Sequence, residues 1–302
     1  MRILLFGANG QVGHELRRSL APLGDVVATT RSGMLEDGMR CEIADFDAPQ
    51  SLPALIERIA PDVVVNAAAY TAVDRAQSDR DAAFRANAEA PLRIAEACAA
   101  RDALLVQYST DYVFDGSATR PYREDDPTAP LGVYGESKLA GEQAVQASGA
   151  RHMIFRTAWV YAAHGKNFMR TMLRLAAERD ELRVVADQIG TPTPAGLIAD
   201  VTAAVLARPF ERSGVWHLTA AGETTWHGFA EAICAAAHAR GLIAAAPRVM
   251  PIATVDYPTP AKRPGYSRLD TARLASDFAI ELPDWPEGLM LTLNELGSIS
   301  AT

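Results

Sequence analysis

The chain has few cysteines and no long apolar run. Its three cysteines, Cys41, Cys98 and Cys234, lie far apart in 302 residues, and their spacing fits neither a disulfide framework nor a zinc site. We therefore expect buried, unreactive thiols. No apolar run approaches the ~20 residues that cross a bilayer, and the first apolar segment passes directly into glycines, without the charged start of a leader. These features predict a cytoplasmic protein with no membrane partner.

Lysine is also scarce, because arginine supplies all of the 29 basic residues except Lys138, Lys166 and Lys262. The net charge is −8 and no stretch gathers basic residues, which excludes nucleic acid as the main partner. Since arginine fills the ordinary surface positions, a remaining lysine is more informative than usual. It offers a compact ammonium group that can change its protonation state.

Apolar segments alternate with helical patterns through the first half of the chain. The predicted strands are RILLFG, DVVAT, DVVVNAA, ALLVQYS and HMIFRTAWV, and the intervening helices are predicted over 11–23, 52–59, 79–100 and after Tyr134. Continuous β-branched strands separated by helices indicate a parallel sheet covered on both faces. The predicted fold class is therefore α/β, a Rossmann-like doubly wound parallel sheet.

The alternation loosens after about residue 160, which indicates a smaller C-terminal substrate-binding lobe. Helices are predicted over 168–179, 197–207 and 226–240, strands over 182–185 and at VWHL, a Pro-rich connection over 247–264 and a last helix from about 270. We predict a dinucleotide-binding domain over 1–160 and a lobe formed mainly by 161–302. The segment 197–225 is a candidate to return to the first domain.

Three glycines, Gly7, Gly10 and Gly13 in GANGQVG, lie between the first strand and the first helix. A dinucleotide fingerprint needs this context, because the chain must turn sharply, approach a pyrophosphate closely and pack the helix on the sheet. The helix N-terminus then offers N–H donors to the phosphates. A plain strand-to-helix turn is the alternative reading.

The second strand ends at Thr30 and is followed by Arg31, where an NAD-selective site usually has a carboxylate. Arg31 could pair with a ribose 2′-phosphate, which favours NADPH over NADH, although a solvated arginine is equally ordinary. Asp45 in CEIADF is placed like a residue beside the adenine amino group, or it is a simple acidic loop residue.

Tyr134 and Lys138 in YGESK are four residues apart on a predicted helix and therefore share one face. A tyrosine becomes a useful proton donor when a neighbouring ammonium stabilises its phenolate. Thr110 ends the strand ALLVQYS, at the sheet edge where ligands of open α/β sheets bind. Alone it reads as a local cap, but with the tyrosine and lysine it predicts a catalytic set that polarises and protonates a substrate oxygen.

The segments GANGQVG, NAAAYTAVD, STDYVFDG, YGESK and RPGYS together resemble the extended short-chain dehydrogenase/reductase superfamily, over almost the whole chain, and within it the nucleotide-sugar reductases. The resemblance implies hydride transfer from NADPH to the C4 keto group of dTDP-4-dehydro-L-rhamnose, with Tyr134 as proton donor and Lys138 also holding the nicotinamide ribose. This would be the last step of dTDP-L-rhamnose synthesis, which supplies cell-surface polysaccharides.

The resemblance also implies which residues bind the ligands. The cofactor residues are Gly7, Gly10, Gln11, Val12 and Gly13 at the pyrophosphate and Ala67, Ala68 and Tyr70 after the third strand, and the substrate residues are Thr110, Asp111, Tyr112 and Trp159. No catalytic metal is predicted. Some members use the position of Glu15 for a magnesium-linked dimer, but a surface glutamate is the simpler reading, and both a monomer and a homodimer stay open.

The sequence alone leaves other functions of the superfamily open. Related dehydratases carry an Asp-Glu pair after the threonine, whereas Tyr112 follows Asp111 here, and epimerase-reductases use a Cys and a His, whereas Cys98 lies one strand too early. The alternatives are another nucleotide-sugar reductase or epimerase, and a non-catalytic NADP-binding regulatory subunit.

Weaker signals accompany these predictions. Asn87 matches a position that organises the active-site backbone in such enzymes, or it is an exposed helical asparagine. Arg263 and Ser267 resemble a C-terminal motif that shapes the substrate lobe, although a Pro-rich connector would have the same appearance. Trp216, His217 and Trp226 are interpreted as packing residues.

Overall fold

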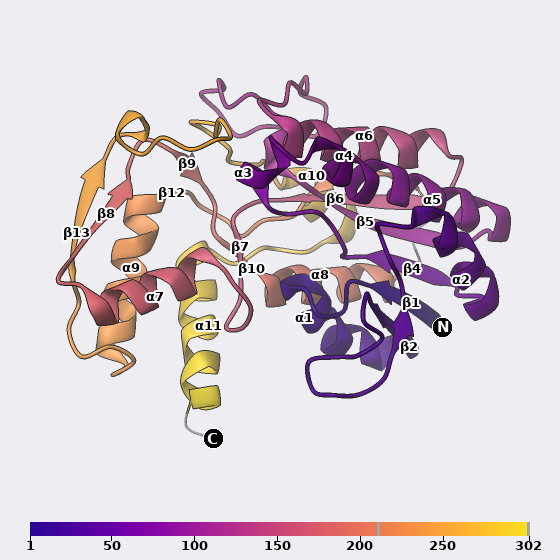
Figure 1. Ribbon diagram of the computed structural model, residues 1–302, viewed down its shortest axis with the longest axis horizontal. Coiled ribbons are helices and arrows are strands. Elements are labelled where there is room, and N and C mark those ends of the chain that lie inside the picture. The colour runs from indigo at the N-terminus through magenta and orange to yellow at the C-terminus, as the bar shows by residue number, and fades with distance from the viewer. Residues whose placement is uncertain (210–211, 301–302) are drawn as a thin grey trace.

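The computed structural model describes residues 1–209 and 212–300. Its centre is a seven-stranded sheet in the order β11-β6-β5-β4-β1-β2-β3, and every neighbouring pair is parallel (Figure 1). The strands are β1 (Arg2–Phe6), β2 (Asp25–Thr30), β3 (Glu42–Ile43), β4 (Val63–Asn66), β5 (Leu104–Thr110), β6 (His152–Thr157) and β11 (Gly214–His217). The strand order reverses between β1 and β4, which is the topological switch point of a doubly wound sheet. The predicted fold class is confirmed.

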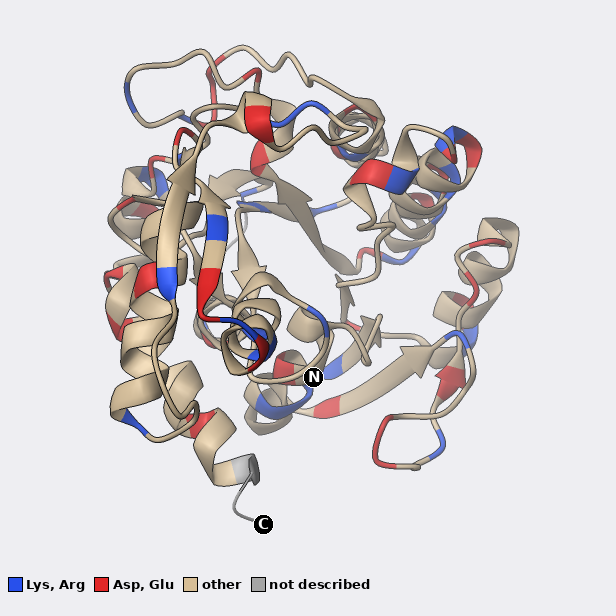
Figure 2. Ribbon diagram, turned by 60° about the vertical axis from the view of Figure 1, so that its left-hand side comes forward, with Lys and Arg blue, Asp and Glu red and all other residues tan. Residues whose placement is uncertain are grey.

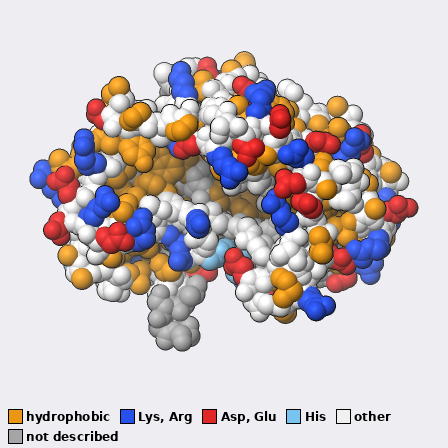
Figure 3. Space-filling model, in the orientation of Figure 1, with side chains coloured by type: hydrophobic (Ala, Val, Ile, Leu, Met, Phe, Trp, Pro, Cys, Tyr) orange, Lys and Arg blue, Asp and Glu red, His pale blue; other side chains and the backbone are white. Residues whose placement is uncertain are grey.

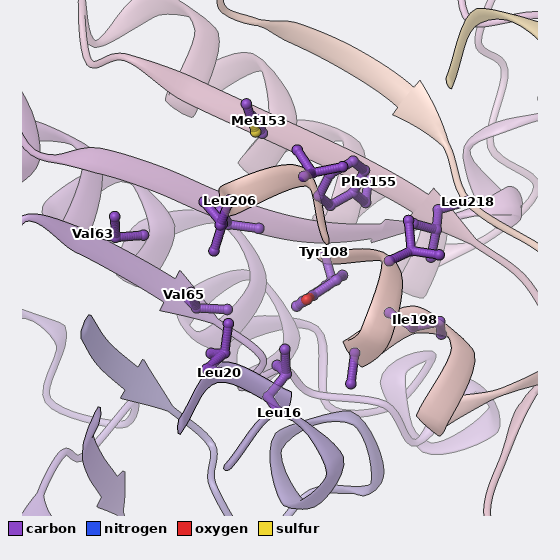
Figure 4. Close-up of a cluster of buried hydrophobic side chains, with 14 of the residues drawn as sticks. Leu16, Leu20, Val63, Val65, Tyr108, Met153, Phe155, Ile198, Leu206 and Leu218 are labelled. Carbon is purple, nitrogen blue, oxygen red and sulfur yellow. The ribbon is translucent and has the colours of Figure 1, made fainter. Parts of the chain in front are cut away.

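Helices cover both faces of the sheet. α1 (Gln11–Leu20), α8 (Ala195–Leu206) and α10 (Ala272–Phe278) pack on one face, and α2 (Leu52–Ile59), α5 (Ala90–Arg101) and α6 (Val133–Ala147) pack on the other. Figure 4 shows Leu16 and Leu20 of α1 and Ile198 of α8 turned towards the strand residues of the first face. The strands are apolar on both sides because both sides are buried.

The remaining elements form a smaller lobe, at the left of Figure 1. It consists of α7 (Phe168–Glu178), α9 (Trp226–Ala239), α11 (Trp285–Ser300) and a parallel pair of strands, β8 (Glu181–Val185) and β13 (Arg248–Ile252). Phe229, which is fully buried, contacts the rings of Tyr161, Phe168 and Trp285. Two short pairs complete the lobe: β7 (Val160–Tyr161) with β10 (Thr193–Pro194), and β9 (Ile189–Gly190) with β12 (Thr224–Thr225).

The helix predicted over 79–100 is interrupted. After α3 (Val73–Ala76) the chain forms α4 (Arg80–Phe84), a π-helical turn (Arg85–Glu89) and then α5. Pro91 at the start of α5 has no N–H to donate to the carbonyl four residues earlier, and Ala90 N donates to Arg85 O, five residues earlier. The turn carries Asn87 and so shapes the site described below.

Two further predictions of elements were wrong. The Pro-rich segment contains β13, where Pro251 is tolerated because the strand belongs to a two-stranded pair, and the single last helix is two helices, α10 and α11. The 3₁₀ turns are η1 (Ala21–Leu23), η2 (Pro49–Ser51), η4 (Asp111–Val113) and η5 (Thr254–Asp256).

Basic and acidic residues are intermixed over both lobes (Figure 2). Among the described residues no helix combines the length and apolar character needed to span a membrane. The three cysteines are free thiols, and two of them, Cys98 and Cys234, are buried.

Gly13→Ala is expected to destabilise the protein by about 1–3 kcal/mol or more, because an added methyl would lie 2.0 Å from Gly7 O and the first turn of α1 would have to move. The matched control is Gly297→Ala in α11, whose methyl would meet Leu242 Cδ2 at an ordinary 3.7 Å. That alanine should be neutral or stabilising by about 0.5–1 kcal/mol. Urea unfolding measures the free energy of unfolding of both variants. Equal values for Gly13→Ala and Gly297→Ala would contradict the tight packing inferred at Gly13.

Candidate active site

A cavity of about 790 Å³ opens at the carboxyl ends of β1, β4 and β5 and reaches the smaller lobe. Figure 3 shows the face on which the surface is hollowed between the two lobes. Most residues predicted from the sequence line this one cavity: Gly7, Gly10, Gln11, Val12, Arg31, Ala67, Ala68, Tyr70, Thr110, Asp111, Tyr112, Tyr134, Lys138 and Trp159. The topology brings them together because all of these segments follow parallel strands that end at the same edge.

The glycine loop forms a cradle at one end of the cavity. Gly7 has a left-handed φ of 78°, and a side chain there would lie 2.7 Å from Ala68 N. Gly10 caps α1 without a side-chain hydrogen bond, so the first N–H groups of the helix face the cavity end. A bare backbone turn at a helix N-terminus is suited to a pyrophosphate, and the residues present therefore fit a dinucleotide.

Gly13 and Asp45 are the predicted residues that do not line the cavity. Gly13 lies beneath the loop, packed against Gly7. Asp45 is instead paired with the exposed guanidinium of Arg31 at 3.6 Å, and Asp47, which does line the cavity, lies 3.2 Å from the same guanidinium. Asp47 was not predicted from the sequence, because the loop after β3 has no motif that shows which carboxylate turns inward.

Tyr134 and Lys138 project from the first turns of α6 into the cavity. Lys138 is buried, and its Nζ donates to Tyr108 O of β5 at 2.7 Å. Tyr134 and Thr110 line the same cavity, and the Tyr134 ring lies edge-on to that of Tyr112, with centroids 5.6 Å apart. The three residues predicted as catalytic are thus neighbours.

Burial changes the pKa values of both Tyr134 and Lys138. It raises the pKa of Tyr134 to about 12, a rise that the hydrogen bond with Thr110 opposes, and it lowers the pKa of Lys138 to about 8, which the charge of Glu142 opposes. The phenol therefore holds its proton at neutral pH while the lysine is still mostly an ammonium. A neutral phenol beside a cation is a proton donor whose phenolate product is stabilised.

Arg156 and Glu142 form a buried ion pair near Lys138 that was not predicted from the sequence. Arg156 of β6 donates to Glu142 through Nε at 3.0 Å and through Nη2 at 2.7 Å, and both side chains are at most 5% exposed. Glu142 is one helical turn beyond Lys138. The spacing of Lys138 and Glu142 on α6 indicates that these two side chains share one face of the helix. Only the fold shows that an arginine lies opposite Glu142.

Asn87 links three segments around the site. From the π-helical turn its Oδ1 accepts from Tyr70 N at 2.8 Å, and its Nδ2 donates to Tyr70 O and to Ser137 Oγ, each at 3.0 Å. Ser137 in turn donates to Tyr134 O. Asn87 therefore fixes the backbone beside both Tyr70 and Tyr134.

The other side of the cavity carries the predicted substrate residues. Burial raises the pKa of Asp111 to about 6, and hydrogen bonds with Ser267 and Thr110 oppose this rise. Trp159 has a left-handed φ of 49°, and its indole stacks on Trp226 with centroids 3.5 Å apart. The stack joins the cavity wall to α9 of the smaller lobe.

Some weaker candidates are also located. Arg263 donates to Asp74 at 2.8 Å. Trp216 and His217 are buried, and Trp216 packs against Phe155 and Phe278. Cys98, the residue considered for an epimerase, lies in the core rather than on the cavity wall, where burial raises the pKa of its thiol to about 12.

The strand order, the glycine loop at the switch point and the Thr110, Tyr134 and Lys138 set define a Rossmann-fold oxidoreductase of the extended short-chain dehydrogenase/reductase class.

Comparison with known proteins narrows the class. The family model described as RmlD substrate binding domain matches residues 1–298, and the chain belongs to this family. A dTDP-4-dehydrorhamnose reductase of Burkholderia thailandensis is 51% identical, over 98% of this chain and 99% of the relative. The resemblance predicted from the sequence motifs is confirmed.

Two solved structures agree with this assignment. A dTDP-4-dehydrorhamnose reductase of Clostridium acetobutylicum is 36% identical with a TM-score of 0.89, covering 98% of this chain and 100% of that chain. The enzyme of Bacillus anthracis, solved in complex with NADP, is 33% identical with a TM-score of 0.87, covering 97% and 99%.

Proposed function

We propose that the protein catalyses the NADPH-dependent reduction of the C4 keto group of dTDP-4-dehydro-L-rhamnose to dTDP-L-rhamnose. The observation that carries the proposal is the cavity in which Tyr134, Thr110 and Lys138 face the same space as the Gly7 loop. The names of the relatives support the choice of substrate. Turnover, as opposed to mere binding of NADP, distinguishes this function from that of a regulatory subunit.

Each catalytic residue has a separate task in this proposal. NADPH, when bound, supplies the hydride. Thr110 holds the keto oxygen towards Tyr134, which donates its phenolic proton as negative charge develops on that oxygen. The Lys138 ammonium stabilises the phenolate that remains and holds the nicotinamide ribose. Asp111, Tyr112 and Trp159 position the sugar and its nucleotide.

The cofactor would lie along the carboxyl edge of the sheet. The Gly7–Gly13 loop and the N-terminus of α1 would hold the pyrophosphate, with Ala67, Ala68 and Tyr70 beside them. Arg31 would meet the 2′-phosphate of NADPH. Because Asp47 shares the guanidinium of Arg31, NADH is expected as a second, weaker cofactor.

The proposal extends to the organisation of the chain. Residues 1–160, with β11, would bind the cofactor, while 161–302 would mainly bind substrate. We place the enzyme in the cytoplasm, as a monomer or homodimer, and assign magnesium no catalytic role.

The test is NADPH oxidation followed by absorbance, with dTDP-4-dehydro-L-rhamnose generated in situ. UDP- and GDP-linked keto sugars, and NADH in place of NADPH, are run beside it. Turnover confined to the dTDP sugar is expected. Tight NADPH binding without turnover of any keto sugar would refute the proposal.

The rate should depend on the protonation of Lys138. Its pKa of about 8 lies below the ordinary value, so the ammonium is complete at lower pH and is lost as the pH rises through about 8. We expect kcat/KM, measured at limiting NADPH, to fall along this limb while Tyr134 stays protonated. A profile that stays flat to about pH 9.5 would contradict this assignment.

A further inference from the structure

A second group of ligating side chains lies outside the cavity, where α1 meets the loop between β7 and α7. His14 and Glu15 belong to α1, and His164 belongs to the loop. One potential ligand atom from each of the three lies within 4.8 Å of the other two. We propose that His14, Glu15 and His164 of a single chain form a binding site for a divalent transition-metal ion such as Zn²⁺.

The three side chains are already gathered for this task. His164 Nε2 lies 2.8 Å from Glu15 Oε1, and the imidazoles of His14 and His164 face each other with centroids 4.1 Å apart. Glu15 is only 7% exposed. His14 Nδ1 is buried and has no hydrogen-bond partner among the described residues, so this nitrogen makes no protein contact that a metal ion would have to replace.

Protonation also favours binding. A hydrogen bond with His164 lowers the pKa of Glu15, which keeps the carboxylate ionised. Burial, aided by His164, lowers the pKa of His14, which keeps that imidazole neutral. An ionised carboxylate and a neutral imidazole are the forms that bind metals, so Glu15 and His14 need lose no proton to bind a cation at neutral pH.

The donor set selects the kind of metal. Two imidazoles and one carboxylate suit Zn²⁺, Co²⁺ or Ni²⁺, whereas Mg²⁺ prefers oxygen ligands alone. In a tetrahedral zinc site, bonds of about 2.0–2.1 Å bring ligand atoms to about 3.3–3.5 Å from one another. Small side-chain rotations would close the present spacing. Three protein ligands leave a fourth position for water.

Two neighbouring charges bear on the site. Arg18 Nη2 lies 3.7 Å from Glu15 Oε2, but this arginine is largely exposed and pairs more closely with Asp200, at 3.0 Å. The second charge is that of Glu295 in α11. Burial, and then the negative charge of Glu15, raise the pKa of Glu295, so the two carboxylates repel each other. A bound cation would relieve this repulsion between carboxylates.

A metal here would join the start of α1 to the loop that borders the cavity. Gln11 Oε1 accepts from Asn167 Nδ2 at 2.8 Å, and Gly165 and Lys166, which follow His164, line the cavity wall. We therefore expect bound Zn²⁺ to raise the melting temperature and to reduce the mobility of residues 162–167.

The experiment uses full-length, untagged protein freed of metal with a chelator. Co²⁺ titration followed by visible absorbance should give an intense four- or five-coordinate spectrum with one ion per chain, and Zn²⁺ should displace the Co²⁺. His14→Gln and His164→Gln each remove a proposed ligand. Loss of an outer-shell partner alone weakens metal binding on the order of 10- to 100-fold, so each variant should weaken Co²⁺ binding at least this much. His14→Gln leaves the Glu15–His164 contact in place, so it separates metal binding from folding.

The matched control is His227→Gln. His227 also lies beside a carboxylate, at 3.4 Å from Glu231, but within residues 1–209 and 212–300 no third ligating side chain joins that pair. The affinity of the His227→Gln variant for Co²⁺ should equal that of the unchanged protein. Unchanged affinity in both His14→Gln and His164→Gln, one ion per two chains, or equal displacement of Co²⁺ by Mg²⁺ would each overturn the proposal.

Discussion

Tyr134→Phe should lower kcat by a factor of about 10² or more while leaving the affinity for NADPH nearly unchanged. The substitution removes only the phenolic oxygen, so the ring still fills its place beside Tyr112. Without that proton donor the developing negative charge on the substrate oxygen must be neutralised by water. Steady-state kinetics with the dTDP sugar and fluorescence titration with NADPH measure the two quantities separately.

The control for this prediction is Tyr122→Phe. The Tyr122 hydroxyl is also hydrogen bonded, to Asp115 at 2.8 Å, but the residue does not line the cavity. It should keep kcat within a few-fold of the unchanged enzyme. Equal kcat values for Tyr134→Phe and the unchanged enzyme would remove Tyr134 from the mechanism.

The catalytic set could be predicted from the sequence because its signals are local. Tyr134 and Lys138 are one helical turn apart, and Thr110 is at the end of a strongly apolar strand. The rule that parallel strands present their carboxyl ends at one edge then brings them to the glycine loop. No long-range contact had to be known.

The features that the sequence analysis missed depend on contacts between distant segments. Arg156 meets Glu142 only because β6 lies beside α6, and His164 reaches Glu15 across 149 positions of the chain. The π-helical turn around Asn87 arises from one missing N–H in an otherwise regular helical pattern. Periodicity identifies elements, but it does not show which polar side chains meet across them.

Glu142→Gln should destabilise the protein by about 3–5 kcal/mol. Glutamine has nearly the same shape, but it leaves the guanidinium of Arg156 without its counter-charge at a position where the side chain is only 5% exposed. The loss is measured as the change in the free energy of urea unfolding. Because the charge of Glu142 raises the pKa of Lys138, the alkaline limb of the kcat/KM profile should also move to lower pH.

Glu136→Gln on the same helix is the matched control. Glu136 pairs with Arg80 at a short 2.6 Å, but the two side chains are 39% and 56% exposed, so water screens the pair and its loss should cost less than about 1 kcal/mol. Replacing both buried partners, as Glu142→Met with Arg156→Met, should recover part of the stability lost in Glu142→Gln, because no unpaired charge remains. Equal losses at positions 136 and 142 would mean that burial does not govern the contribution of Glu142. The alkaline limb would then separate the two roles, since only the loss of a charge next to Lys138 moves it.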